Sequence, residues 1–495
     1  MKSIKLNALA FMGIRVLNII FPILTGTYVA RILDRTDYGY FNSVDTIISF
    51  FLPFATFGVY NYGLREISNI KDNKNKVNKI FSQLFYLCVC CTILTYTVYF
   101  FAYPLFFENN PVLKKIYLVM SIQLMAQIFS IEWINEALEN YSFLFYKTAF
   151  IRIMMLIAIF AFVKNEHDII IYSLIMTLST TINLLISYFW IKRDVSFVKV
   201  RLHEYKPLFL PLIAMVIFAN ANMLFTFLDR LFLVKLGNEL FVTYYTMAQR
   251  IINVIAGVIT GAIGVSVPRL GYYLGNNDKE SYTYLVNKGA RIFSFFIVPI
   301  SVGATLLGPH TILLYGSEKY LGGGMLTSLF AIRTIILALE TILGSQIIFV
   351  NGFEKQLTSF TVIAGGINLG LNTLLFSNSV TSPEYYLITT MLSEVILVSM
   401  YIVFIKSKHL ISLRNIFKYT IKYLLFSSSF VVIYFLVNYI YPVEMIINLK
   451  FLINVAIVIT LSVISYITCL ITTKDAIFFE FLNHIIKIKN RLLSK

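Results

Sequence analysis

The chain has few charged residues and few cysteines. Only 13% of its 495 residues are charged, against roughly 25% in an ordinary soluble domain, and 58% are hydrophobic. This composition excludes a soluble globular protein, because the surface of such a protein needs many more polar groups. The four cysteines, Cys88, Cys90, Cys91 and Cys469, lie in apolar stretches with no second Cys-x-x-Cys pair. They are expected to pack as small apolar residues rather than to bind metal or form disulfides.

Motifs for nucleotide, metal and acid–base chemistry are also missing. No Gly-x-x-x-x-Gly-Lys-[Ser/Thr] motif occurs, so nucleotide hydrolysis is not expected. The histidines are expected in loops or tails, which leaves no imidazole in a membrane span for a proton relay or a metal; they are His167, His203, His310, His409 and His484. We therefore predict no enzyme activity, no catalytic residue, no metal and no cofactor.

Long apolar stretches recur along the whole chain. Each has about twenty residues, enough to cross a hydrocarbon layer of roughly 30 Å as a helix, which pairs its backbone polar groups internally. The predicted fold class is an all-α polytopic membrane protein with about 14 transmembrane helices. The predicted spans are 8–30, 40–64, 80–104, 116–137, 146–163, 169–190, 207–228, 242–266, 289–307, 324–350, 357–376, 385–405, 418–440 and 450–472.

Lysine and arginine are distributed unevenly among the loops between these spans. They cluster around residues 65–79, 192–206, 269–291 and 406–422, in loops that the span order places on one side. Positive short loops stay in the cytoplasm, so both termini are predicted to be cytoplasmic. The net charge of +16 then reflects orientation and attraction to membrane lipids, and no nucleic-acid partner is predicted.

The two halves of the chain share a weak repeat. Gly39-Tyr40 precedes Arg65 by nearly the same spacing as Tyr244-Tyr245 precedes Arg269. The copies are offset by six helices, which predicts a parallel repeat of two six-helix lobes around a central cavity. The predicted parts are an N-terminal lobe at 1–193, a C-terminal lobe at 206–406, two peripheral helices at 418–472 and a basic amphipathic tail at 473–495.

Several polar and charged residues lie inside the predicted spans. Lipid-facing helices exclude charge, so these residues indicate interior surfaces. Some could be structural locks, such as Arg333 with Glu340, whereas a hydrated cavity lined by arginines would suit an anionic head group. The candidate substrate-binding residues are Arg15, Asn18, Gln249, Arg250, Asn253 and Arg333, and the acids with a possible ion-coupling or structural role are Asp45, Asp229, Glu340 and Glu394.

Two segments near the N-terminus carry a family resemblance. These two segments are YVARILDRTDYGYFN at 28–42 and FGVYNYGLREISNIKDN at 57–73, and a later segment is LDRLFLVKLGNELFVTYYTMAQRI at 228–251. In these segments the chain resembles the Wzx-type polysaccharide repeat-unit flippases. The resemblance covers about the first twelve spans. It implies the fold of the multidrug/oligosaccharidyl-lipid/polysaccharide exporter superfamily. In the related lipid II flippases, arginines on helices 1, 2 and 8 are held important. Arg15 and Arg250 match helices 1 and 8 by position, and Arg65 is the candidate on helix 2.

The resemblance also implies a substrate and a location. The substrate would be an undecaprenyl-pyrophosphate-linked oligosaccharide, moved from the inner to the outer leaflet of the bacterial cytoplasmic membrane for capsule, O-antigen or another surface polysaccharide. A polysaccharide polymerase and chain-length machinery are further candidate partners. Two alternatives stay open: a multidrug/cation antiporter on the same fold, which the arginines disfavour, and a membrane glycosyltransferase or polymerase, which the short outer loops disfavour.

Overall fold

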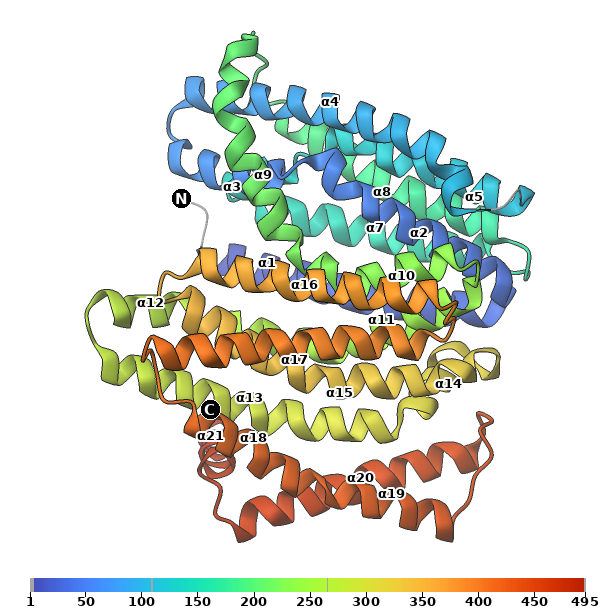
Figure 1. Cartoon of the computed structure of the whole chain (residues 1–495), viewed down its shortest axis with the longest axis vertical. Coiled ribbons are helices and arrows are strands. Elements are labelled where there is room, and N and C mark those ends of the chain that lie inside the picture. Colours follow the sequence, from blue (N-terminus) through green and yellow to red (C-terminus); the bar gives the residue numbers. More distant parts are fainter. Residues whose placement is uncertain (1–3, 108–109, 265, 494–495) are drawn as a thin grey trace. The chain divides into compact units, whose positions relative to one another are not determined.

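Helices are the only regular secondary structure in the part of the chain that the computed structural model describes, residues 4–107, 110–264 and 266–493. The chain forms two compact units. The first comprises Met1–Thr246 and Phe376–Thr381, and the second comprises Met247–Leu375 and Ser382–Lys495. Figure 1 follows the helices of both units along the sequence. The predicted lobe boundaries at 193 and 206 stay a prediction.

In the first unit, long helices lie side by side. α1 packs along α7, and α5 packs along both α2 and α8. The elements are α1 (Ile4–Ile32), α2 (Arg35–Thr56), α3 (Val59–Ile70), α4 (Lys74–Phe106), α5 (Pro111–Met125), η1 (Ala126–Phe129), α6 (Glu132–Ala137), α7 (Tyr141–Phe162), α8 (Ile169–Ile191), η2 (Leu202–Tyr205), α9 (Lys206–Asn220), η3 (Ala221–Leu224), α10 (Thr226–Lys235) and the start of α11 (Glu239–Gly264).

The second unit continues from α11. Its central helix α13 packs along α15 and α18, and α15 also packs along α17. The elements are α12 (Val267–Gly275), α13 (Lys279–Leu306), α14 (Gly308–Gly316), η4 (Glu318–Gly323), α15 (Gly324–Thr341), the π-helical segment η5 (Ile342–Phe349), α16 (Glu354–Ser377), α17 (Pro383–Ser407), α18 (Arg414–Ser427), α19 (Ser429–Ile440), α20 (Leu449–Thr472) and α21 (Ala476–Leu493).

The prediction of a multi-pass membrane protein is confirmed. In the described residues, twelve helices or helix runs are long and apolar enough to cross a membrane. The predicted count of fourteen is not confirmed, because the segments 207–228 and 242–266 are not among the twelve. The first of these is divided into α9, η3 and α10, and the second corresponds to α11, which carries Glu239 and Arg250.

Polar caps extend several helices beyond the apolar stretches. Asn73 accepts a hydrogen bond from the Lys76 N–H at 3.1 Å, so α4 begins at Lys74 rather than near residue 80. Asp278 likewise caps Ser281, and α13 begins at Lys279, ten residues before the predicted start of that span. Hydropathy indicates which part of a helix lies in lipid, whereas a capping residue indicates where the backbone hydrogen bonds of the helix begin.

The structure refines one predicted span, which lies within the candidate span Arg35–Ile70, and corrects one prediction about a histidine. The predicted span 40–64 contains a break between α2 and α3, where Phe57 and Gly58 both adopt left-handed conformations, with φ of 43° and 71°. A Cβ at Gly58 would lie 2.8 Å from the Leu212 carbonyl oxygen, so glycine fits both the conformation and the space. His310 is not in a loop: it is buried in α14, with its ring stacked on Phe451.

The helices of the second unit keep their apolar residues on outward faces as well as in the core. On α20, Leu449, Val463 and Ile464 are at least half exposed, whereas Asn454 of the same helix is fully buried. Asn454 donates hydrogen bonds to Asn438 at 3.1 Å and to the Tyr441 carbonyl at 2.9 Å. In soluble proteins apolar residues are buried and polar residues face solvent; here apolar residues face outward and a polar residue is buried, as expected for helices surrounded by lipid.

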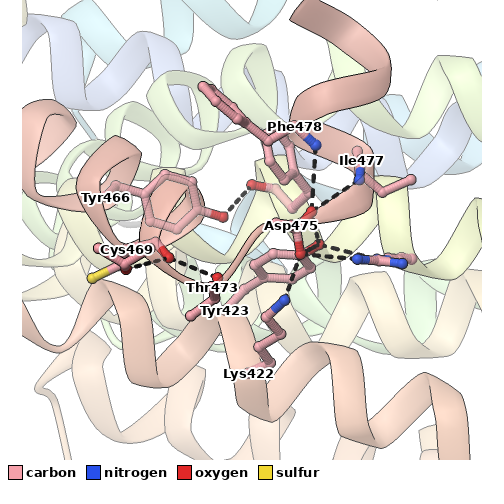
Figure 2. Close-up of polar contacts among 11 residues, drawn as sticks. Lys422, Tyr423, Tyr466, Cys469, Thr473, Asp475, Ile477 and Phe478 are labelled. Atoms are coloured by element: carbon pink, nitrogen blue, oxygen red, sulfur yellow. Dashed lines mark hydrogen bonds and ion pairs between the residues drawn. The ribbon is translucent and has the colours of Figure 1, made fainter.

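The predicted amphipathic tail is a helix in the structure, α21, and one carboxylate holds its start. Asp475 is fully buried and accepts hydrogen bonds from Arg291 of α13 at 2.9 Å and from Lys422 of α18 at 2.5 Å (Figure 2). Its other oxygen caps α21 through the backbone N–H groups of Ile477 and Phe478. Asp475 therefore sets both where α21 begins and what it docks on.

Aromatic side chains complete this docking. Phe481 of α21 packs against Phe295 and Phe296 of α13, and Tyr466 of α20 donates a hydrogen bond to the Phe295 carbonyl at 2.8 Å. At the surface, Lys288 pairs with Glu480 at 2.6 Å. The first turns of α21 are thus joined to α13 by apolar packing and by one exposed ion pair.

Replacing Asp475 with alanine should loosen α21. It leaves two partly exposed bases without their anion, and we expect the free energy that docks α21 to fall by about 2 to 4 kcal/mol, near the lower part of the range for buried pairs. Trypsin cleavage after Lys474 should become faster. The Glu480→Ala control removes only a surface pair and should change docking by at most about 1 kcal/mol. Equal cleavage of all three proteins would contradict the role of Asp475.

Low pH should also loosen the docking of α21 in the native chain. Burial alone would raise the pKa of Asp475, but hydrogen bonds from Lys422 and Arg291 outweigh it, so the pKa lies below its ordinary value. A lowered folded-state pKa stabilises docking above the unfolded value of about 3.9, and this contribution disappears as pH falls through the folded-state pKa. Cleavage after Lys474, measured with a protease that works in acid, should therefore rise below about pH 4 in the native protein and change less in Asp475→Ala.

Candidate functional site

A buried ion pair lies inside the second unit. Arg333 of α15 donates hydrogen bonds from Nε to both carboxylate oxygens of Glu394 of α17, at 3.1 and 2.9 Å, and from Nη2 to Oε1 at 2.5 Å. The two side chains are only 8% and 1% exposed. A planar guanidinium and a carboxylate in this arrangement satisfy each other's charge where lipid and apolar side chains cannot.

The partner of Arg333 could not be read from the sequence. Glu394 lies 61 residues further along the chain and enters the pair only because α15 and α17 pack side by side. Glu340, the partner considered from the sequence, is half-buried in the last turn of α15, just before the π-helical segment. The substrate-binding role predicted for Arg333 stays a prediction, and its guanidinium is already engaged by Glu394.

The other candidates of the second unit lie on α11. Gln249 and Arg250 are half-buried, and Asn253 is exposed. The three occupy one stretch of helix, with Arg250 and Asn253 three residues apart and hence on the same face. This face combines a permanent positive charge with an amide, groups that can donate hydrogen bonds to phosphate or sugar oxygens.

The candidates of the first unit are spread over three helices. Asn18 of α1 is exposed, Asp45 of α2 is half-buried, and Asp229 of α10 is fully buried and accepts a hydrogen bond from the Tyr245 hydroxyl. The side chain of Arg15 lies outside the described residues. Asn18 is the candidate that joins a larger polar group, which is formed with residues of α6, α7 and α8.

That polar group centres on a lysine. The Lys147 ammonium of α7 forms an ion pair with Glu132 of α6 and donates hydrogen bonds to the Ser187 hydroxyl at 2.6 Å and the Asn183 carbonyl at 3.1 Å, both in α8. The Lys147 side chain is 2% exposed. Asn183 also donates its amide to Glu132 at 3.3 Å. Three helices are therefore joined through one buried ion pair.

A polar cavity lies beside this ion pair. Its volume is about 250 Å³, and it is lined by Ile14, Asn18, Glu132, Thr148, Ile151, Arg152, Ser179, Thr180 and Asn183. Sequence reasoning did not single out Lys147 or Arg152, although both stand within the predicted span 146–163. The available signal was the presence of two basic residues in an otherwise apolar span, since lipid does not tolerate such groups.

Comparison with known proteins identifies the family. Residues 28–322, more than half of the chain, match the family described as polysaccharide biosynthesis protein. The chain belongs to this family. Two relatives, from Shigella dysenteriae and from Escherichia coli strain K12, are each named "Putative O-antigen transporter". The first is 23% identical over 74% of this chain and 91% of its own, and the second is 19% identical over 83% of this chain and 98% of its own.

Solved structures give the family its fold. The lipid II flippase MurJ in an inward closed conformation matches with a TM-score of 0.68 at 17% identity, over 95% of this chain and 99% of its own. An inward-facing multidrug resistance MATE transporter of the MOP superfamily matches with a TM-score of 0.59 at 12% identity, over 81% of this chain and 98% of its own. The predicted family and its exporter-superfamily fold are confirmed.

The Arg333–Glu394 pair predicts a specific pattern of stability. Glu394→Ala leaves a buried arginine without its anion and should lower the free energy of unfolding by about 3 to 5 kcal/mol. The double variant Arg333→Met/Glu394→Leu removes both charges and should recover most of that loss. Thermal unfolding in detergent would measure the difference.

Glu354→Ala is the matched control for this test, because Glu354 is exposed in the first turn of α16. Its melting temperature should stay within about a degree of the native value, as surface substitutions change the free energy of unfolding by roughly 0.5 kcal/mol or less. A double variant as unstable as Glu394→Ala alone would mean that the pair does more than neutralise its own charges.

Proposed function

We propose that this protein is a flippase that moves undecaprenyl-pyrophosphate-linked oligosaccharide repeat units from the inner to the outer leaflet of the bacterial cytoplasmic membrane. The observation that carries the proposal is membership of a polysaccharide biosynthesis family whose two nearly full-length relatives are named as O-antigen transporters. The fold, shared with a lipid II flippase, is consistent with a lipid-linked substrate of this kind. The relatives' name makes an O-antigen repeat unit the first substrate to test.

The physical chemistry of the substrate agrees with the polar interior of the helices. A polyprenyl tail can remain in lipid, so only the sugar and pyrophosphate need a polar path. The half-buried Arg250 of the second unit suits that path, because a guanidinium keeps its charge and donates paired hydrogen bonds to phosphate. Arg15 is the corresponding candidate on α1.

The acidic residues argue against the cation antiporter. A cationic substrate would need unpaired carboxylates, but Glu394 is held by Arg333 and Glu132 is held by Lys147. Two of the acids inside the spans are thus neutralised by bases in the same unit. The antiporter remains the alternative to be excluded by transport.

Transport in proteoliposomes tests the proposal directly. The native protein should translocate a fluorescent undecaprenyl-pyrophosphate oligosaccharide, and Arg250→Ala and Arg15→Ala should each slow it by at least about tenfold, the effect of losing a charged hydrogen bond. Lys192→Ala, an exposed residue just after α8, is the matched control and should transport normally. Full activity in both arginine variants would make these arginines structural. Cation-driven drug transport without saccharide transport would favour the antiporter.

The membrane potential offers a second test. Outward movement of about two negative charges, with the cell interior negative, would be favoured by roughly 4 to 5 kcal/mol per 100 mV. We therefore expect an imposed potential of this sign to accelerate transport and the opposite sign to slow it. Rates that ignore the potential would rule out electrophoretic driving and would favour ion coupling through Asp45, Glu340 or Glu394.

A further inference from the structure

The polar cavity of the first unit lies deep in the helices that form it. Arg152 is the twelfth of the 22 residues of α7, and Ser179 and Thr180 lie near the middle of α8. Asn18 is near the middle of α1. Four polar residues from three membrane-crossing helices therefore line one cavity, and polar residues on such helices favour a cavity that admits water or a polar ligand.

The charges around this cavity do not cancel. Lys147 and Glu132 neutralise each other in their ion pair, and Arg152 adds a second positive charge beside them. Within the described part of the chain, the one hydrogen bond donated by the Arg152 side chain is a long contact of 3.9 Å to the Met155 sulfur. Most of its N–H groups are thus available to the cavity. The nearby Glu132 is already engaged by Lys147, so the three charges sum to one positive charge that a bound anion would neutralise.

The remaining lining is suited to the same ligand. The hydroxyls of Thr148 and Ser179 and the amide of Asn18 can donate hydrogen bonds, as phosphate or carboxylate oxygens require. The volume of 250 Å³ corresponds to about eight water molecules at about 30 Å³ each, which is room for one such group and some water. It is too small for a whole oligosaccharide.

We propose that this cavity is a binding site for a single acidic group, a phosphate or a carboxylate, with Arg152 as its main ligand. The group can come from two sources: a free inorganic anion, or an acidic group of the lipid-linked saccharide. The second source rests on the proposed function, and the first does not. The Lys147–Glu132 pair positions α7 against α6 and α8. Glu132 also lines the cavity and interacts electrostatically with Arg152, so its single negative charge is shared between two bases.

Binding to the full-length protein in nanodiscs of neutral lipid tests this site. The probes are inorganic phosphate, acetate and the lipid-linked oligosaccharide, each titrated by calorimetry. Arg152→Gln should weaken at least one of them by about tenfold or more, the effect of removing a charged hydrogen-bond donor, and Arg152→Lys should retain part of the affinity. Arg193→Gln, a surface arginine of the same unit that stacks on Trp190, is the matched control and should bind like the native protein.

The pattern across the probes identifies the source. Weaker binding of phosphate or acetate would assign a free-anion site, and an effect on the lipid-linked saccharide alone would assign an acidic group of the substrate. Native-like affinity of folded Arg152→Gln for all three probes would overturn the proposal. If that variant fails to fold, the same titrations are made with Arg152→Lys and Thr148→Val. Native-like binding of all three probes by both of these variants would likewise overturn the proposal.

The failure of this site and the failure of the flippase proposal can be told apart. If the native protein transports the saccharide and Arg152→Gln transports and binds it equally well, the site is wrong and the flippase proposal stands. If the native protein transports no saccharide, the phosphate and acetate titrations still decide whether Arg152 binds an anion.

Discussion

The cost of placing charge at membrane depth governs the organisation of this protein. Lipid offers no hydrogen bonds, so each charged side chain in a span must find its partner within the bundle of helices. Arg333 finds Glu394, and Lys147 finds Glu132 together with the oxygens of two α8 residues. On α20 the buried Asn454 satisfies the same requirement by hydrogen bonding, while apolar residues such as Leu449 and Ile464 are exposed.

The same constraint separates structural charges from candidate functional ones. A charge that is fully matched by its neighbours has no free energy to gain from a ligand, whereas a charge left with weak contacts gains much. By this criterion the paired Arg333 fits a structural role, and Arg152 fits the ligand-binding role that we propose for it. The distinction depends on contacts between helices, and the identity of the residue alone does not reveal it.

The sequence alone predicted the features that depend on one segment of the chain. It did not predict the features that depend on contacts between distant helices. Membrane spans and the family follow from local apolarity and short motifs, and the structure and the comparisons confirm them. The segment predicted as an amphipathic tail contains the helix α21. The pairing of Arg333 with Glu394 depends on the packing of two distant helices, so it could not be deduced. The break at Phe57–Gly58 escaped notice because a glycine in an apolar run gives no sign of its backbone conformation. Arg152 could have been singled out as a basic residue in an apolar span, but the cavity that it lines is formed by residues of four helices and is not visible in any one segment.

The Arg333–Glu394 pair also limits how this family can change during evolution. Losing either residue alone strands a charge in the interior, so a lineage that passes through such a single substitution carries a destabilised transporter until the second position changes. The two positions are therefore expected to be inherited as a unit, either as the pair or as two apolar residues.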